Sequence, residues 1–273
     1  MAKMTFVRAL RSEAVRLRRS PLVAMHLVLA VALGGCAGLY FSGAAWDSLL
    51  GADAFFQLLG AGAPLIVGIS CGLAVDAERE AGDGANLLGV PSRRRALAAK
   101  GTVLLALGFT AALVATLLFI ALLAVAGREV PPLAACVGAA AGVAAGSVVL
   151  YAVSLWIALR FGRNASIGVG ALGLVVALAS MGGLANGLVT GSLSGAFGLD
   201  AAVFVPFAWP SRLASLAVEA AVAVPLGFGP QAVAALAGSL ARIGAVCAVA
   251  TAALVAVLLA RANRFEDKRR AAE

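Results

Sequence analysis

The residue types that most often perform chemistry are scarce in this chain and lie far apart. The only histidine is His26, and the four cysteines (Cys36, Cys71, Cys136 and Cys247) occur singly inside apolar runs, with no CxxC spacing. Metal and redox sites need such residues in clusters, so we interpret the cysteines as small buried side chains. We identify no GxxxxGK[ST], no HExxH and no GxSxG with a partner histidine. The sequence therefore predicts no catalytic site, no metal and no cofactor in this chain.

Charge is concentrated instead in one polar interval, residues 76–100, which lies between long apolar runs. Its Pro91-Ser92 pair predicts the start of a second short helix, because Pro suits a first helical turn and Ser caps one. We interpret this interval as the cytoplasmic face of a membrane protein and as the part that meets a soluble partner. Its charged residues are Asp76, Glu78, Arg79, Glu80, Asp83, Arg93, Arg94, Arg95 and Lys100.

Composition supports a membrane location for the elements around this interval. The chain is 62% hydrophobic and only 12% charged, whereas soluble domains carry about 25% charged residues. A chain of 273 residues has room for about six spans of ~20 residues. The net charge of +8 is compatible with nucleic-acid binding, but the basic residues flank apolar runs, which is typical of topology signals.

Residues 1–20 predict a basic amphipathic helix in the membrane interface. Phe6, Leu10, Ala14 and Leu17 recur at helical spacing, and arginines fill the other face. The alternative is a plain basic flank without a defined helix. We expect no cleavable signal peptide, because the basic region is long and the apolar run after Pro21 is long enough to span.

The apolar runs predict an all-α integral membrane protein with six spans, at about 21–41, 54–75, 101–126, 133–159, 165–190 and 235–260. With the N-terminus inside, 18 of the 21 basic residues fall inside and three (Arg128, Arg212 and Arg242) fall outside. This asymmetry predicts that both termini, including the basic tail 261–273, are cytoplasmic. His26 and Arg242 lie near predicted span ends, so we expect both at the membrane interface.

The segment 191–234 is apolar but interrupted by Gly and Pro, so it fits neither a water-exposed loop nor a full span. It predicts short re-entrant helices on the outer side, with Trp209-Pro210-Ser211-Arg212 at the interface and Glu219 paired with Arg212 or Arg242. Asp47, Asp53, Asp200 and Glu219 are either an outer acidic surface or ordinary solvated loop residues. In the fourth span, Gly138, Gly142 and Gly146 indicate either close helix packing or general small-residue bias.

The predicted span centres contain no Asp, Glu or Lys, and the two halves show no repeat, which disfavours an ion-coupled carrier. The absence of catalytic clusters disfavours a membrane enzyme. Two hypotheses remain: a transporter subunit that is driven by ATP hydrolysed elsewhere, and a non-transporting sensor or scaffold subunit. In both, the interval 76–100 meets the partner.

The order of these elements resembles the ABC-2 type permeases, the membrane halves of type V ABC exporters. The resemblance is carried by Arg11-Ser12-Glu13, by the segments 16–21 and 76–82, by Leu87-Leu88-Gly89-Val90-Pro91-Ser92-Arg93 and by Ala98-Ala99-Lys100. Within that family the chain is most similar to the lantibiotic-immunity permeases, which have an aromatic-Pro segment like residues 204–210 before the last span.

The resemblance implies a single membrane domain that pairs with a second, related permease and with two copies of an ATP-binding subunit, which carries the ATP and Mg²⁺. It implies export of a lantibiotic, a similar antimicrobial peptide or another amphiphile from a bacterial cytoplasmic membrane. Residues 1–20 would be the elbow helix, including Glu13, Arg16, Arg18 and Arg19. Residues 76–100 would be the coupling helix that docks on the ATPase, through Asp76, Glu78, Arg79, Glu80, Leu87, Leu88, Pro91 and Arg93. The segment 191–234 would be the outer gate, with Phe204, Pro206, Phe207, Trp209 and Pro210.

Overall fold

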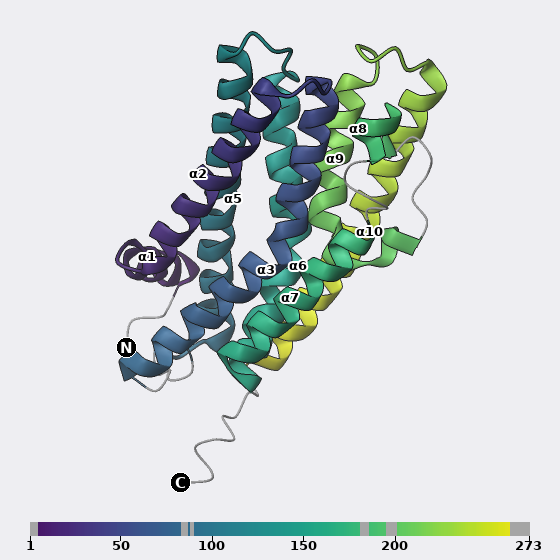
Figure 1. Ribbon diagram of the computed structural model, residues 1–273. Helices are drawn as coiled ribbons and strands as arrows, with labels where there is room; N and C mark the ends of the chain where they lie inside the picture. The colour runs from purple at the N-terminus through teal and green to yellow at the C-terminus, as the bar shows by residue number, and fades with distance from the viewer. Residues whose placement is uncertain (1–4, 83–86, 88–89, 181–185, 195–200, 263–273) are drawn as a thin grey trace.

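The computed structural model describes residues 5–82, 87, 90–180, 186–194 and 201–262, and throughout this part of the chain the regular elements are helices. Six of them are long and apolar enough to cross a membrane, which confirms the predicted all-α membrane architecture. They pack side by side as a bundle (Figure 1). They are α2 (Pro21–Gly43), α3 (Ser48–Gly82), α5 (Arg93–Val125), α6 (Leu133–Phe161), α7 (Arg163–Ser180) and α10 (Pro230–Ala262).

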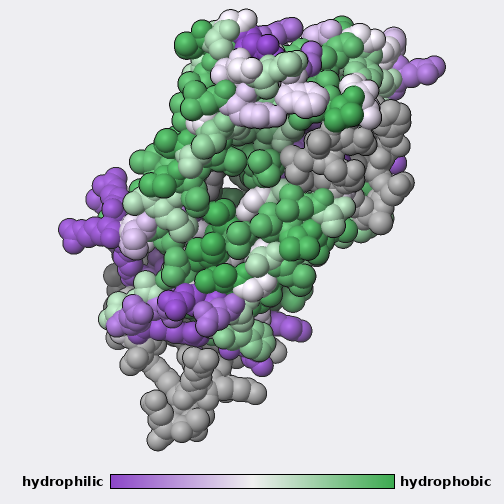
Figure 2. Space-filling model, viewed as in Figure 1, coloured by the Kyte–Doolittle hydropathy of each residue, from purple (hydrophilic) through white to green (hydrophobic). Residues whose placement is uncertain are grey.

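The bundle has two distinct ends. The basic end, at the bottom of Figure 1, holds α1 (Phe6–Arg18), the end of α3, the start of α5 and the α6–α7 turn. The far end holds the turns 44–47, 126–132 and 223–229. Figure 2 shows hydrophilic residues at both ends and a hydrophobic belt between them. This distribution is the one that a bilayer imposes on a spanning bundle.

Helix α1 runs across the direction of the spans, next to the start of α2, and Figure 1 views it nearly end-on. Thr5 caps its start by accepting a hydrogen bond from Arg8 N, and Ser20 caps α2 in the same way, with Pro21 in the first turn of α2. Two helices that begin with their own caps and meet at residues 19–20 form a bend. The predicted amphipathic helix is therefore a separate element from the first span.

Several spans differ in length from the sequence prediction. Helix α3 begins before residue 54 and continues past residue 75, and α5 begins at Arg93 instead of 101. Hydropathy detects only the apolar part of a helix, whereas backbone hydrogen bonds continue through the polar turns on either side. Ser92 accepts a hydrogen bond from Arg95 N and caps α5, so Pro91-Ser92 begins the third span and not a second short helix.

Short helices precede the last span, as predicted: η2 (Ala201–Phe204), η3 (Pro206–Ala208) and α9 (Trp209–Val222). The predicted fifth span (165–190) was too long, because α7 ends at Ser180 and a separate short helix, α8 (Asn186–Thr190), occupies the end of that range. Helix α9 lies inside the bundle against α3 and α6. A Cβ atom added to Gly60 of α3 would lie 2.3 Å from Ser211 Cα, and one added to Gly146 of α6 would lie 2.5 Å from Pro210 N. The start of α9 therefore contacts its neighbours backbone to backbone, and Gly142 makes a similar approach to Leu213 while Gly138 has open space.

Packing near the far end is dominated by aromatic rings. Phe55 of α3 stacks on Phe119 of α5 with centroids 4.1 Å apart, and Phe41 of α2 meets Phe119 edge-on. Such pairs add about 0.5–1.5 kcal/mol beyond their buried area. Three of the four cysteines are buried as predicted, whereas Cys36 is exposed on α2.

Candidate functional site

Four charged side chains form a closed ring at the basic end of the bundle. Arg16 Nη1 lies 2.9 Å from Glu13 Oε1 and 3.0 Å from Glu78 Oε1. Lys100 Nζ lies 2.7 Å from Glu13 Oε2 and 3.0 Å from Glu78 Oε1. Each acid contacts both bases, and each base contacts both acids. We refer to Glu13, Arg16, Glu78 and Lys100 as the charge ring.

Three helices supply the charge ring. Glu13 and Arg16 are one helical turn apart on α1, Glu78 is in the last two turns of α3, and Lys100 is in the second turn of α5. Ala9 and Glu13 are the buried residues of α1, so the face of this helix that packs against the bundle also holds the Glu13 carboxylate. The charge ring therefore fastens α1 to two spans that are distant from it in sequence.

The charge ring is largely shielded from solvent. The side chains of Glu13, Glu78 and Lys100 are only 7–8% exposed, and that of Arg16 is 38% exposed. Two acids and two bases leave no net charge, which limits the cost of burial. Removing one member would leave a buried excess charge, so the four residues depend on one another.

A second set of contacts joins the end of α3 to the α6–α7 turn. Asp76 Oδ2 lies 2.8 Å from Arg163 Nη1, and Arg79 Nη2 donates to Leu159 O at 2.6 Å. At that turn Gly162 adopts φ 95°, which favours glycine. The last turns of α3 thus contact α1 and α5 through Glu78, and α6 and α7 through Asp76 and Arg79.

These contacts place the predicted coupling residues in different environments. Glu78 was expected to reach basic residues of a partner, but its carboxylate is 7% exposed and lies within the charge ring. Glu80 is exposed, as are Pro91, Arg94 and Arg95, whereas Leu87 is buried. Arg93 is half-buried at the start of α5. Asp83 and Leu88 lie outside the described residues.

The predicted elbow residues lie in two environments: some pack against the bundle and the others are exposed. Glu13 and Arg16 belong to the charge ring, whereas Arg18 and Arg19 are exposed at the end of the helix. These two arginines are the basic residues nearest to the start of α2. The contact of Arg18 and Arg19 with lipid headgroups, which is expected of a basic interfacial helix, stays a prediction.

A buried polar network lies in the half of the bundle toward the far end. Ser215 donates to Asp53 Oδ1 at 2.5 Å, and Gln57 Nε2 donates to Asp53 Oδ2 at 2.8 Å. Arg212 donates to Ser194 Oγ at 3.2 Å, and Ser194 donates to Glu219 Oε1 at 2.8 Å. We refer to Asp53, Gln57, Ser194, Arg212, Ser215 and Glu219 as the far-end polar network.

The far-end polar network corrects several predictions about the outer segment. Asp53 is 3% exposed and Glu219 is 0% exposed, so neither belongs to an outer acidic surface. Arg212, 7% exposed, was expected at the interface beside Trp209, but both are inside the protein. Arg212 and Glu219 are joined through Ser194. Asp47 is exposed and caps α3 through Leu49 N and Leu50 N, and Asp200 lies outside the described residues.

The predicted outer-gate residues also differ in exposure. Trp209 is 1% exposed and its indole nitrogen donates to Val203 O at 2.8 Å. Pro210 packs between Gly60 and Gly146. Phe207 and Pro206 are half-buried, whereas Phe204 is 74% exposed. The segment is thus anchored at Trp209–Pro210 and exposed at Phe204.

His26 is 2% exposed and faces the inside of the bundle, five residues after the start of α2; its predicted position at the membrane interface stays a prediction. Its Nδ1 lies 2.8 Å from Leu22 O and its Nε2 lies 3.3 Å from Ser70 Oγ. Ser70 stands in a Gly68–Gly72 segment with GxSxG spacing, so the sequence analysis missed a GxSxG serine with a histidine partner. This serine lies inside a continuous helix, where it donates to Ile66 O at 2.6 Å. A nucleophile of this motif needs an exposed hydroxyl on a strained strand-to-helix turn, so we assign the pair a structural role. Arg242 is exposed on α10.

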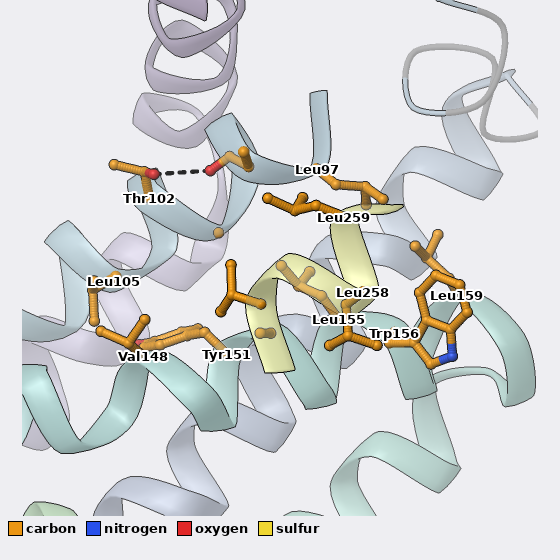
Figure 3. A pocket seen from close by; sticks show the side chains of 14 residues that line it. Leu97, Thr102, Leu105, Val148, Tyr151, Leu155, Trp156, Leu159, Leu258 and Leu259 are labelled. Atoms are coloured by element: carbon orange, nitrogen blue, oxygen red, sulfur yellow. Dashed lines mark hydrogen bonds between the residues drawn. The ribbon is translucent and has the colours of Figure 1, made fainter. Parts of the chain in front are cut away.

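Apolar cavities lie in the middle of the bundle. One of about 320 Å³ is bounded by α2, α3, α5 and α6, and another of about 170 Å³ is bounded by α5, α6 and α10 (Figure 3). Leu105 and Tyr151 line both. A wider, open groove of about 690 Å³ lies between α6, α9 and α10 and is lined mainly by Gly, Ala and Leu. We refer to it as the α6–α10 groove.

Sequence reasoning named Glu13, Arg16, Glu78 and Lys100 separately but did not pair them. It also missed Gln57, Ser194 and Ser215. Asp53 and Gln57 lie four residues apart at the edge of an apolar run and therefore share one face of a helix. This spacing is the sequence signal that both polar side chains point into the bundle.

Comparison with known proteins gives one positive result. A family model described as an ABC-2 family transporter protein matches residues 9–180, a range that contains the charge ring and ends before α8. No curated protein matches the chain.

Proposed function

The chain belongs to the ABC-2 transporter family, and from this premise we propose that it exports a lantibiotic or a similar amphipathic antimicrobial peptide from the membrane. Members of this family are the membrane-spanning component of an ABC transporter, and they work with a separate ATP-binding subunit. The finer proposal concerns the orientation of the chain, its coupling to that subunit and its substrate.

The proposed orientation has the basic end in the cytoplasm of a bacterium. Arginines and lysines gather on α1, on the start of α5 and at the α6–α7 turn, and positive residues are retained on the cytoplasmic side. The ATP-binding subunits would then meet the chain at this end. A second permease, similar or identical, would complete the transporter.

The charge ring is the observation that carries the coupling proposal. A force applied at the end of α3 reaches α5 through Glu78 and Lys100, and reaches α1 through Glu78 and Arg16. Exposed groups at the same end of the bundle, Glu80 and Arg94, are the proposed contacts with the ATP-binding subunit. The buried ring would convert one docking event into a joint movement of three helices.

The α6–α10 groove supports an amphiphilic substrate. It has a volume of about 690 Å³ and is lined largely by small apolar residues. A peptide that already lies in the bilayer needs an apolar, laterally open surface and an exit, not a polar channel with buried charge. We propose that this groove, with the second permease opposite, forms the path, and that the segment from Phe204 to Pro210 controls its outer end.

The test is expression of the chain together with its ATP-binding partner in a peptide-sensitive strain, followed by killing curves with a panel of lantibiotics. We expect protection against at least one peptide, lost when the ATP-binding subunit is catalytically inactive. Protection that persists with the inactive subunit would instead indicate a sensor or scaffold. No protection against any peptide, with the complex assembled in the membrane, would overturn the peptide-export proposal.

A further inference from the structure

The larger apolar cavity opens sideways between α2 and α3, within the hydrophobic belt in which Figure 2 shows a hollow. Leu29 of α2 and Leu58 of α3 stand at its edge and are 42% and 39% exposed. Gly62 lines it, and a Cβ atom added there would have no neighbour within 4 Å. The cavity is thus accessible from the bilayer and has space next to Gly62.

Two polar side chains at the cavity, those of His26 and Ser147, are engaged in hydrogen bonds. His26 contacts Leu22 O and Ser70, and Ser147 donates to Val143 O at 2.7 Å. The remaining lining is mostly aliphatic, with Phe109 and Tyr151 as its aromatic residues. An apolar cavity of roughly 150 Å³ suffices to bind benzene, so about 320 Å³ accommodates a length of hydrocarbon chain.

Positive charge stands within one leaflet's depth of the cavity mouth. Arg18 and Arg19 are exposed at the end of α1. Leu29 follows Pro21, the first residue of α2, by eight residues, which is ~12 Å along the helix, and Arg18 and Arg19 lie just before that helix. The hydrocarbon layer of one leaflet is ~15 Å deep, half of a ~30 Å core. A lipid with its phosphate at these arginines has an acyl chain long enough to enter between α2 and α3.

We propose that the α2–α3 cavity binds an acyl chain of an anionic phospholipid whose phosphate lies on Arg18 and Arg19. The apolar cavity binds the acyl chain of the lipid, and the arginines at the end of α1 bind its negatively charged phosphate. Because the same elbow carries the charge ring, the bound lipid borders the contacts that join α1 to α3. The site does not depend on the identity of the exported substrate.

The test uses the full-length chain in nanodiscs that contain phosphatidylglycerol with a photoreactive group in its acyl chain. Crosslinks should concentrate on residues 26–33 of α2 and 58–67 of α3. The change Gly62→Leu fills the cavity, and we expect it to lower this labelling by more than about tenfold, since each buried methylene contributes roughly a factor of four in affinity. The matched control is Gly168→Leu, at an exposed glycine of α7 that also has open space, and it should leave the labelling unchanged.

A second comparison tests the headgroup. The double change Arg18→Gln/Arg19→Gln should reduce the preference for phosphatidylglycerol over phosphatidylcholine by roughly fivefold per arginine. The control Arg160→Gln/Arg261→Gln removes two other exposed arginines and should preserve it. Labelling of the cavity that is no stronger than that of the exposed face of α7, or that is unaffected by Gly62→Leu, would overturn the proposal. Occupation by an added peptide in place of lipid would do the same.

Discussion

Lys100 Nζ lies 2.7 Å from Glu13 Oε2, although 87 residues separate the two in the chain. The elbow helix is therefore attached to the third span directly, in addition to its covalent link with the first. With Arg16 and Glu78 the contact closes into a ring with no net charge. The following predictions test what this ring and the other buried groups contribute.

Lys100→Met should destabilise the protein by about 3–5 kcal/mol, because it leaves Glu13 and Glu78 buried with one cation between them. The measurement is the free energy of unfolding in detergent micelles. The double change Lys100→Met/Glu78→Gln restores neutrality and should recover most of the loss. As a control, Arg163→Gln breaks a pair whose side chains are 46% and 29% exposed, and should cost no more than about 1 kcal/mol. Equal effects of the two single changes would contradict the role assigned to the buried ring.

The double variant also separates stability from coupling. With the bundle folded, α3 and α5 no longer share an ion pair, so peptide-dependent ATP hydrolysis by the assembled transporter should fall while its basal hydrolysis remains. Basal and stimulated rates are measured on the same preparation. Full stimulation in the double variant would show that force passes between the helices by another route.

Glu78 and Glu80 should behave differently although they are two residues apart. Glu80 is exposed, so Glu80→Ala should change the free energy of unfolding by less than about 0.5 kcal/mol and weaken association with the ATP-binding subunit. Glu78→Ala should lower stability even in the isolated chain, because Lys100 loses a buried partner. Thermal unfolding of the isolated chain and co-purification of the complex distinguish the two effects. Loss of stability in Glu80→Ala would contradict this assignment.

Arg212→Met should destabilise the far half of the bundle by about 3–5 kcal/mol, since Asp53 and Glu219 would remain buried without their cation. Arg242→Met is the control, because Arg242 is exposed on α10 and its loss should have little effect on stability. Hydrogen exchange of α9 in detergent reports the change locally. Unaltered protection of α9 in Arg212→Met would show that the network does not hold this helix.

Gly60→Ala should displace the start of α9, because the added Cβ would lie 2.3 Å from Ser211 Cα. Overpacking of this kind costs about 1–3 kcal/mol. Gly62→Ala, two residues along the same helix, adds the same atom where no neighbour lies within 4 Å and should be neutral or slightly stabilising, because Ala favours a helix. The difference in melting temperature between the two variants is the measurement. Equal melting temperatures would mean that α9 does not pack against α3 at this point.

Much of the architecture could be predicted from the sequence, because long apolar segments in a bilayer have few alternatives to helices. The six spans, the separate elbow helix and the short helices before the last span were all predicted. The ends of α3 and α5 were not, because a helix continues for as long as its backbone bonds are made, and Asp76 to Gly82 carries no apolar signal. The extra turns are the ones that hold Glu78.

The partners of the charged residues could not be predicted. Glu13, Glu78 and Lys100 are each ordinary residues at the edge of an apolar run, and only the packing of three helices makes them neighbours. Arg212 and Trp209 were placed at the interface because both residue types favour it. Both are buried instead, because Gly60 and Gly146 allow α9 to pack inside the bundle. The Arg212 guanidinium can be buried there because it donates hydrogen bonds to Ser194 Oγ and to the Ser180 carbonyl.

The charge ring also sets an order of events during synthesis. A chain made from its N-terminus presents Glu13, Arg16 and Glu78 before Lys100 exists. At that stage the charge ring consists of two acids and one base, an unbalanced set. Balance is reached only when the third span has been made and its first turns have packed. Packing of the first turns of α5 is therefore the step that completes the neutral ring.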